Sequence, residues 1–137
     1  MEKLLSQNPN TWTIVTFHHP NFSYGRELDE RDTRNAFLTL FDKYHVDLVL
    51  TGHDHTYARS FKLNRSAIAA KNQPGTVYVV SSSGPKYYVA NPRYQSLMAK
   101  TAVDQSMFQV VSVNGNKLEY KAYTAASTLF DSFELVK

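Results

Sequence analysis

Two short apolar segments that flank a helical segment constrain the fold of this chain more than any other feature. Residues 12–17 and 46–51 are rich in β-branched and aromatic side chains, so both are predicted to be buried strands. The helix predicted between them covers residues 28–44, and its apolar face comprises Ala36, Phe37, Leu40, Phe41 and Tyr44. A strand, a crossover helix and a second strand form a right-handed unit with parallel strands. The sequence therefore predicts the α/β class.

Three histidines directly follow these two strands. His18 follows the first strand, and His53 and His55 follow the second. The carboxyl ends of parallel strands lie at one edge of a sheet, where ligand sites collect, so we expect these side chains to meet. Imidazole is a common ligand for Zn, Fe, Mn or Ni. Gly52 is expected to let the chain bend so that both later rings turn toward one site.

A His-x-His sequence in a loop is, taken alone, more often a pair of solvent-exposed polar residues than a metal site. The interpretation of His53 and His55 as ligands therefore depends on His18, which the predicted topology brings to the same edge. Asp54 between them is a weaker candidate for direct metal binding. We expect it to support the ligands or to face solvent.

The remainder of the chain is predicted to be mostly β structure. The Asn114-Gly115 pair between two alternating segments is a strong hairpin signal. Strands are expected at residues 75–81, 108–113, 117–123 and 130–136, and a helix at residues 92–100. The last three strands run consecutively and have one polar face, which suits the outer layer of a sandwich. No internal repeat or Gly/Ser-rich linker divides the chain, so residues 1–137 form one domain or one piece of a domain.

Composition argues against several classes of protein. The absence of Cys excludes a disulfide framework and a thiolate zinc site. The net charge is +3, and the Lys and Arg residues are scattered, so no nucleic-acid groove is expected. No apolar run approaches the roughly 20 residues that a membrane span requires. The N-terminal residues lack the apolar core of a signal peptide and are typical of the last turns of a helix, so we interpret Met1 as a truncated start.

Two of these segments resemble conserved blocks of a known enzyme family. Val15-Thr16-Phe17-His18 and Gly52-His53-Asp54-His55 are similar to the V-x-x-H and G-H-x-H blocks of the calcineurin-like metallophosphoesterases. His18-His19-Pro20 and the run at residues 44–59 resemble the purple acid phosphatase branch, and the resemblance is clearest over residues 12–59. It implies an αββα sandwich of two mixed sheets, to which residues 1–137 contribute about the C-terminal half.

The resemblance also implies a function and a set of site residues. The parent protein is expected to be a metal-dependent phosphoester hydrolase of the acid phosphatase type. Its two metal ions, Fe with Zn, Mn or a second Fe, lower the pKa of bound water and neutralise charge on the phosphoryl group. His18 and His53 match ligands of the divalent ion, and His55 matches a ligand of the other. Candidates for substrate contact are His19, Tyr24 and Arg26, and candidates for supporting the ligands are Asp54, Tyr57 and Arg59.

The chain departs from the family pattern in one decisive respect. The earlier blocks, G-D-x-G, G-D-x-x-Y and G-N-H-[ED], do not occur in it, so the bridging Asp and a general acid are not identified. We therefore expect a partial or empty metal site and almost no activity in this chain alone. The expected partners are a phosphoester substrate, the missing N-terminal half of the domain and a second copy of the chain, because a half sandwich leaves sheet edges uncovered. We expect neither nucleic acid nor membrane as a partner.

The alternative function is a non-catalytic relic or regulatory module that keeps the fold and binds a metal or a protein. Localisation does not follow from the residues; the resemblance alone implies an exported parent, periplasmic or extracellular.

Overall fold

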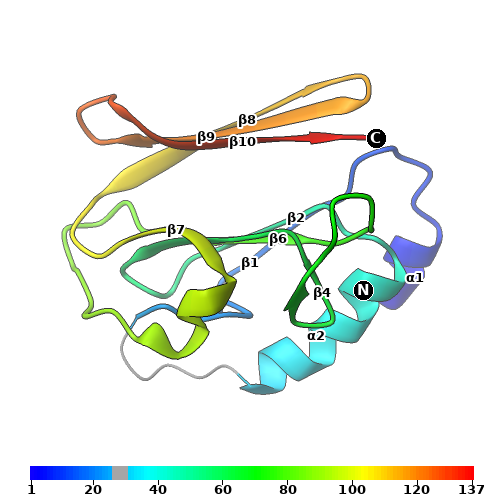
Figure 1. Ribbon diagram of the computed structural model, residues 1–137, viewed down its shortest axis with the longest axis horizontal. Coiled ribbons are helices and arrows are strands. Elements are labelled where there is room, and N and C mark those ends of the chain that lie inside the picture. The colour runs from blue at the N-terminus through cyan, green and yellow to red at the C-terminus, as the bar shows by residue number, and fades with distance from the viewer. Residues whose placement is uncertain (26–30) are drawn as a thin grey trace.

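Two β-sheets lie face to face, and the helices cover the outer side of the larger sheet (Figure 1). The computed structural model describes residues 1–25 and 31–137, without the side chains of residues 32 and 33. The helices are α1 Glu2–Ser6, α2 Arg31–Lys43 and the 3-10 helix η1 Pro92–Leu97. The strands are β1 Ile14–Phe17, β2 Leu48–Thr51, β3 Tyr57–Ser60, β4 Leu63–Asn64, β5 Ala67–Ile68, β6 Val77–Val80, β7 Met98–Ala102, β8 Met107–Asn114, β9 Lys117–Thr124 and β10 Leu129–Val136.

The larger sheet is mixed and has the strand order β1-β2-β6-β3-β7. β1 pairs with β2 and β2 with β6 in parallel, while β3 is antiparallel to both β6 and β7. The predicted crossover from one parallel strand through a helix to the next is confirmed. In the observed register Phe17 is opposite Thr51, and Thr51 is opposite Val80, so three parallel strands end at one edge.

Apolar residues on both faces of the larger sheet form two separate cores. Alternate residues of β6 serve different cores: Val77 and Val79 face the smaller sheet, whereas Tyr78 and Val80 face the helices. On the helix side, Phe41 of α2 is fully buried against this sheet. Burial on both faces explains the continuous apolar sequence of β6.

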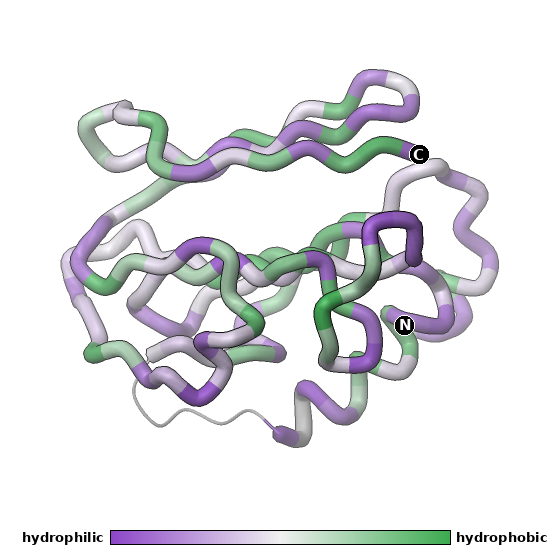
Figure 2. The backbone as a smooth tube through the Cα atoms, viewed as in Figure 1, coloured by the Kyte–Doolittle hydropathy of each residue, from purple (hydrophilic) through white to green (hydrophobic). Residues whose placement is uncertain are grey.

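The smaller sheet is antiparallel, with strand order β10-β9-β8. The alternation predicted for the second hairpin strand is confirmed, since Leu118, Tyr120 and Ala122 are all 0% exposed. Figure 2 shows the matching alternation of hydrophobic and hydrophilic residues along this sheet. The turn lies one residue later than the Asn-Gly signal, at Gly115-Asn116. Gly115 has a positive φ of +56°, which a primed turn requires at its first central residue. None of the helices in the described part of the chain is long and apolar enough to cross a membrane.

The prediction that the first strand is buried is wrong. Ile14 of β1 is 40% exposed, and no residue of this strand is fully buried. β1 lies at the edge of the larger sheet and pairs only with β2 among the described strands. Its β-branched residues therefore correctly predict a strand, whereas the burial of their side chains depends on a neighbouring element on the outer side of β1.

The helix predicted at residues 92–100 is also only partly correct. The structure has the 3-10 helix η1, interrupted at Tyr94 (φ −108°, ψ 18°), and then β7 from Met98 onward. Pairing of Met98 with Ser60 of β3 extends the sheet and buries the Met side chain. Tertiary pairing thus overrides the local preference of these residues.

Sequence patterns also missed β3 and the β4–β5 hairpin. The turn of that hairpin places Arg65 (φ 49°) and Ser66 (φ 63°) in the left-handed region, although neither is Gly, Asn or Asp. Without those residue types, the sequence carries no recognisable hairpin signal there.

Candidate metal centre

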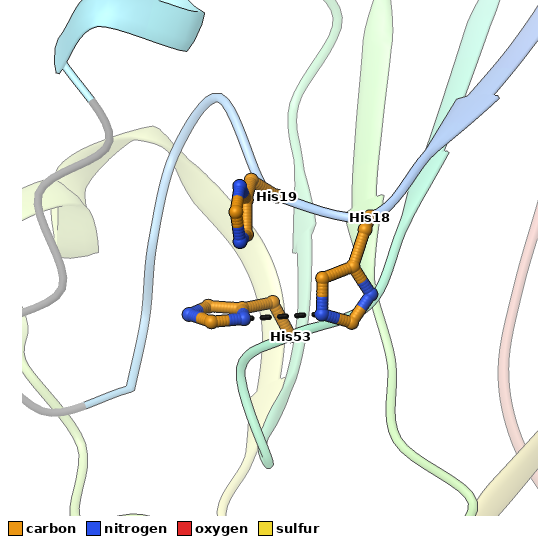
Figure 3. Close-up of side chains that lie close together, drawn as sticks. All are labelled: His18, His19 and His53. Atoms are coloured by element: carbon orange, nitrogen blue, oxygen red, sulfur yellow. Dashed lines mark hydrogen bonds between the residues drawn. The ribbon is translucent and has the colours of Figure 1, made fainter.

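Three imidazoles from two adjacent loops meet where β1 and β2 end (Figure 3). His18 and His19 directly follow β1, and His53 follows β2 after one intervening residue, Gly52. One possible ligand nitrogen from each of the three rings lies within 4.8 Å of the others. The backbone N–H of Gly52 donates to the carbonyl of His18 at 3.0 Å, which holds the two loops in register.

Two ring nitrogens of His18 and His53 are within hydrogen-bond distance, and their separation is close to that of two ligands on one ion. His53 Nδ1 lies 3.1 Å from His18 Nε2. Two nitrogens bound to one tetrahedral Zn at about 2.0–2.1 Å lie about 3.3–3.4 Å apart. Both side chains are accessible to solvent, His18 being exposed and His53 half-buried, so an ion can reach them. The chemistry and spacing of these donors therefore fit a divalent metal.

A strained backbone turns the His53 ring toward His18. His53 has φ +65°, in the left-handed region that β-carbon-bearing residues seldom occupy. Gly52 does not have a positive φ, so the bend expected at Gly52 occurs instead at the histidine itself. Such a conformation costs of order 1–3 kcal/mol and is characteristic of functional sites.

His55 is held apart from this group by contacts with the loop that follows β6. Its Nδ1 lies 3.0 Å from the carbonyl oxygen of Lys86, and its ring centroid is 4.7 Å from that of Tyr88. A carbonyl oxygen only accepts, so Nδ1 donates to it, and in the neutral imidazole Nε2 is then the nitrogen that can bind a metal, as in many metal-binding histidines. Of the three histidines expected to meet, the structure thus brings together His18 and His53, accompanied by His19 rather than His55.

Asp54 connects the loop after β2 to the loop after β1. Its Oδ2 accepts hydrogen bonds from Ser23 Oγ at 2.8 Å, from the Tyr24 N–H at 2.7 Å and from the Gly25 N–H at 2.9 Å. The side chain is fully buried, and this burial raises the pKa of its carboxyl despite the three donors. Asp54 is therefore directed at the loop after β1, not at the three histidines.

The remaining candidates have different environments. Tyr24 is only 7% exposed, and its hydroxyl donates to Gln95 Oε1 at 2.7 Å, so its side chain faces the interior. Arg26 lies outside the described residues. Tyr57 and Arg59 on β3 both donate to Asp131 of the smaller sheet.

The sequence interpretation missed two contributors to this region. Asp131 is 72 residues from Arg59 in sequence, and no local pattern joins them. The loop after β6 was also missed, although a strand at residues 75–81 was predicted. A third parallel strand must deliver its following loop, including Lys86 and Tyr88, to the same edge.

Comparisons with known proteins agree with the geometry. Residues 1–57 match the family model of the calcineurin-like phosphoesterases. The chain is 30% identical over 127 residues to a phosphoenolpyruvate phosphatase of Allium cepa, covering 84% of this chain and 25% of that protein. It is 36% identical over 59 residues to an acid phosphatase of Aspergillus ficuum, covering 43% of this chain and 10% of that protein.

Solved structures show the same fold. A purple acid phosphatase from yellow lupin (Lupinus luteus) seeds superposes with a TM-score of 0.84 at 19% identity, over 98% of this chain and 27% of that one. GAP50, the anchor in the inner membrane complex of Plasmodium, superposes with a TM-score of 0.72 at 17% identity, over 99% of this chain and 40% of that one. The chain thus spans a quarter or less of the length of these curated relatives.

Proposed function

Because this chain is a purple acid phosphatase-like metallophosphoesterase of the calcineurin-like type, we propose that its parent protein is a phosphoester hydrolase with a dinuclear metal centre. The relatives named as phosphatases are consistent with a phosphoester substrate. In this proposal, residues 1–137 are the C-terminal part of the catalytic domain and contribute His18, His53 and His55.

One observation carries the proposal: the 3.1 Å separation of His18 Nε2 and His53 Nδ1 at the end of two parallel strands. These atoms would bind one ion, and His55 Nε2, fixed by the contact of Nδ1 with Lys86, would bind the other. Bound together, two such ions activate water and neutralise negative charge on a phosphoryl group. In this proposal the chain holds the nitrogen donors in place, and the left-handed backbone of His53 directs one of them toward His18.

The carboxylates of a complete centre would come from the N-terminal half of the domain. Among the described residues, the group that can hold a metal contains only histidines. The nearest acid in sequence, Asp54, accepts three hydrogen bonds from the neighbouring loop. Since three neutral imidazoles hold two cations poorly, we propose that the isolated chain is nearly inactive. The N-terminal half would also pair with the open edge of β1.

A comparison of two protein lengths tests the function. We expect the 137-residue chain to hydrolyse p-nitrophenyl phosphate and bis-p-nitrophenyl phosphate at background rates with Zn²⁺, Mn²⁺ or Fe. A protein extended upstream to include the Gly-Asp and Gly-Asn-His blocks should hydrolyse one of them with metal present. His53→Gly in the extended protein should abolish turnover, because Gly adopts the left-handed backbone without strain but provides no ligand.

The control is His45→Asn, because His45 also has a positive φ of 50° but lies in the turn just after α2, outside the three-histidine group. Asn tolerates this backbone, so turnover should be unchanged. An extended protein that is inactive with every metal, or turnover by the short chain comparable to a complete enzyme, would contradict the proposal.

The structure of GAP50 is the observation that favours a second, non-catalytic function. That protein has the same fold and is described as an anchor in the inner membrane complex. A non-catalytic module that binds a metal or a protein is therefore the alternative for this chain. It would gain support if the extended protein folded, bound metal and hydrolysed neither ester. Export of the parent rests on the resemblance to purple acid phosphatases, and fractionation of cells that produce the extended protein tests it.

A further inference from the structure

The side chain of His19 has no role in the proposed dinuclear centre, yet it lies inside the three-histidine group. Its ring centroid is 4.3 Å from that of His53 and 5.1 Å from that of His18. Figure 3 shows the three rings converging from the two loops. We infer that His19 is a third protein ligand, so that His18, His19 and His53 form a three-imidazole site for one divalent ion. This inference rests on the proposed metal centre and adds a ligand to it.

The local backbone brings two consecutive histidines to the same side. In an extended strand His18 and His19 would point to opposite faces of the sheet. The chain bends at both residues where β1 ends, so the rings lie together. Pro20 follows directly and is fully buried, and a residue before proline is restricted to extended backbone. The position of the His19 main chain is therefore fixed before any ion binds.

The second loop is equally constrained. The hydrogen bond from the Gly52 N–H to the His18 carbonyl locks the loop ends together, and the positive φ of His53 turns its ring back toward them. The His18 and His53 nitrogens form a hydrogen bond at 3.1 Å, slightly less than the separation of two ligands on one zinc ion. All three donor nitrogens lie within 4.8 Å of one another, so we expect rotation of the His19 side chain to bring its nitrogen to the same ion.

The donor set indicates the class of metal. Three neutral imidazoles and an open position toward solvent match the sites that proteins build for Zn²⁺ and related borderline ions. Mg²⁺ and Ca²⁺ prefer oxygen ligands, and the described group has none. We therefore expect Zn²⁺ or Co²⁺ to bind the 137-residue chain at one equivalent without the upstream carboxylates.

Zn²⁺ titration of the chain, followed by NMR of the imidazole ¹⁵N nuclei, tests the assignment for each ring. The first equivalent should shift one nitrogen of His18, His19 and His53, and leave His45 and His55 unchanged. In calorimetry, His19→Ala should weaken Zn²⁺ binding by at least roughly 100-fold, the upper end of the loss seen when a residue merely supports a ligand. His45→Asn should bind like the original chain. His19 is exposed, so His19→Ala should keep the original melting temperature.

The outcomes separate this inference from the proposed function. Shifts at His18 and His53 without His19, together with unchanged affinity of His19→Ala, overturn the third ligand and leave the dinuclear proposal intact. No binding of Zn²⁺ or Co²⁺ by the chain overturns the three-imidazole site. The dinuclear proposal is then decided by the hydrolysis assay on the extended protein.

Discussion

Removal of the Asp131 carboxylate is the perturbation whose energetic effect the structure defines best. Asp131 on β10 accepts hydrogen bonds from Arg59 Nε at 2.6 Å, from Arg59 Nη2 at 2.9 Å and from the Tyr57 hydroxyl at 2.7 Å. The Arg59 and Asp131 side chains are only 15% and 6% exposed. This network joins the smaller sheet to β3, which begins two residues after His55.

The magnitude follows from what Asp131→Ala leaves behind. The guanidinium of Arg59 would stay largely buried without a counter-charge, which costs about 3–5 kcal/mol in comparable buried pairs. The Tyr57 hydroxyl would keep a partner, since Tyr120 Oη lies 3.3 Å away, so it adds little. A loss of about 3–5 kcal/mol is a large part of the 5–15 kcal/mol that stabilises a typical domain. Asp131→Asn also removes the counter-charge of Arg59 and offers only one acceptor oxygen, so its cost should fall in the same range of about 3–5 kcal/mol.

Urea unfolding at pH 7, followed by circular dichroism, measures these differences in the free energy of unfolding. Glu134→Ala is the matched control, because Glu134 is also a β10 carboxylate, paired with Lys117 at 2.5 Å. That pair is half exposed, so its loss should cost at most about 1 kcal/mol. Equal effects of Asp131→Ala and Glu134→Ala would refute the conclusion that burial makes the Asp131 network important.

Three further predictions concern acid stability, a loop and two glycines. Burial raises the pKa of Asp131, but its hydrogen-bond donors outweigh burial and hold that pKa below the ordinary value. The contribution of the ionised Asp131 carboxylate to the free energy of unfolding should therefore be complete above about pH 4 and vanish as the pH falls through the folded pKa. Acid unfolding of Asp131→Asn should lack this contribution. Asp54→Ala should cost at least about 2 kcal/mol and accelerate hydrogen exchange of the two amides that bond to Oδ2, whereas Asp54→Asn, which keeps an acceptor oxygen, should do neither. Gly75→Ala should lower the free energy of unfolding by about 1–3 kcal/mol in thermal unfolding, since a β-carbon would lie 2.6 Å from the Leu63 carbonyl oxygen. A β-carbon at Gly84 would meet nothing within 4 Å, so Gly84→Ala should be neutral or slightly stabilising. Equal melting temperatures for the two alanine variants would contradict this reading of the glycines.

Local sequence patterns were sufficient for the elements whose residues interact over short distances. The crossover from residues 12–17 to residues 46–51 is recognisable because each strand and the helix between them has its own periodicity. Alternation in β9 likewise predicted which of its residues are buried. From parallel strands it also followed that residues at their carboxyl ends, including His18 and His53, would lie close together.

Other features depend on contacts between residues that are distant in sequence. The exposure of β1 is set by the absence of a described neighbour on its outer side, and β7 forms because Met98 pairs with β3. Neither the edge position of β1 nor the pairing of β7 with β3 can be recognised from the residues of these strands. The Arg59–Asp131 pair likewise depends on how two sheets pack.

The candidate site divides in the same way. That histidines follow two neighbouring strands could be predicted from the residues alone, because chain order and strand direction fix which residues reach that edge. By contrast, the grouping of His19 with His18 and His53, and the contact of His55 with the loop after β6, depend on the packed fold. Ring direction depends on the left-handed turn at His53 and on the Lys86 carbonyl, and such conformations and distant contacts leave no periodic signal in the sequence.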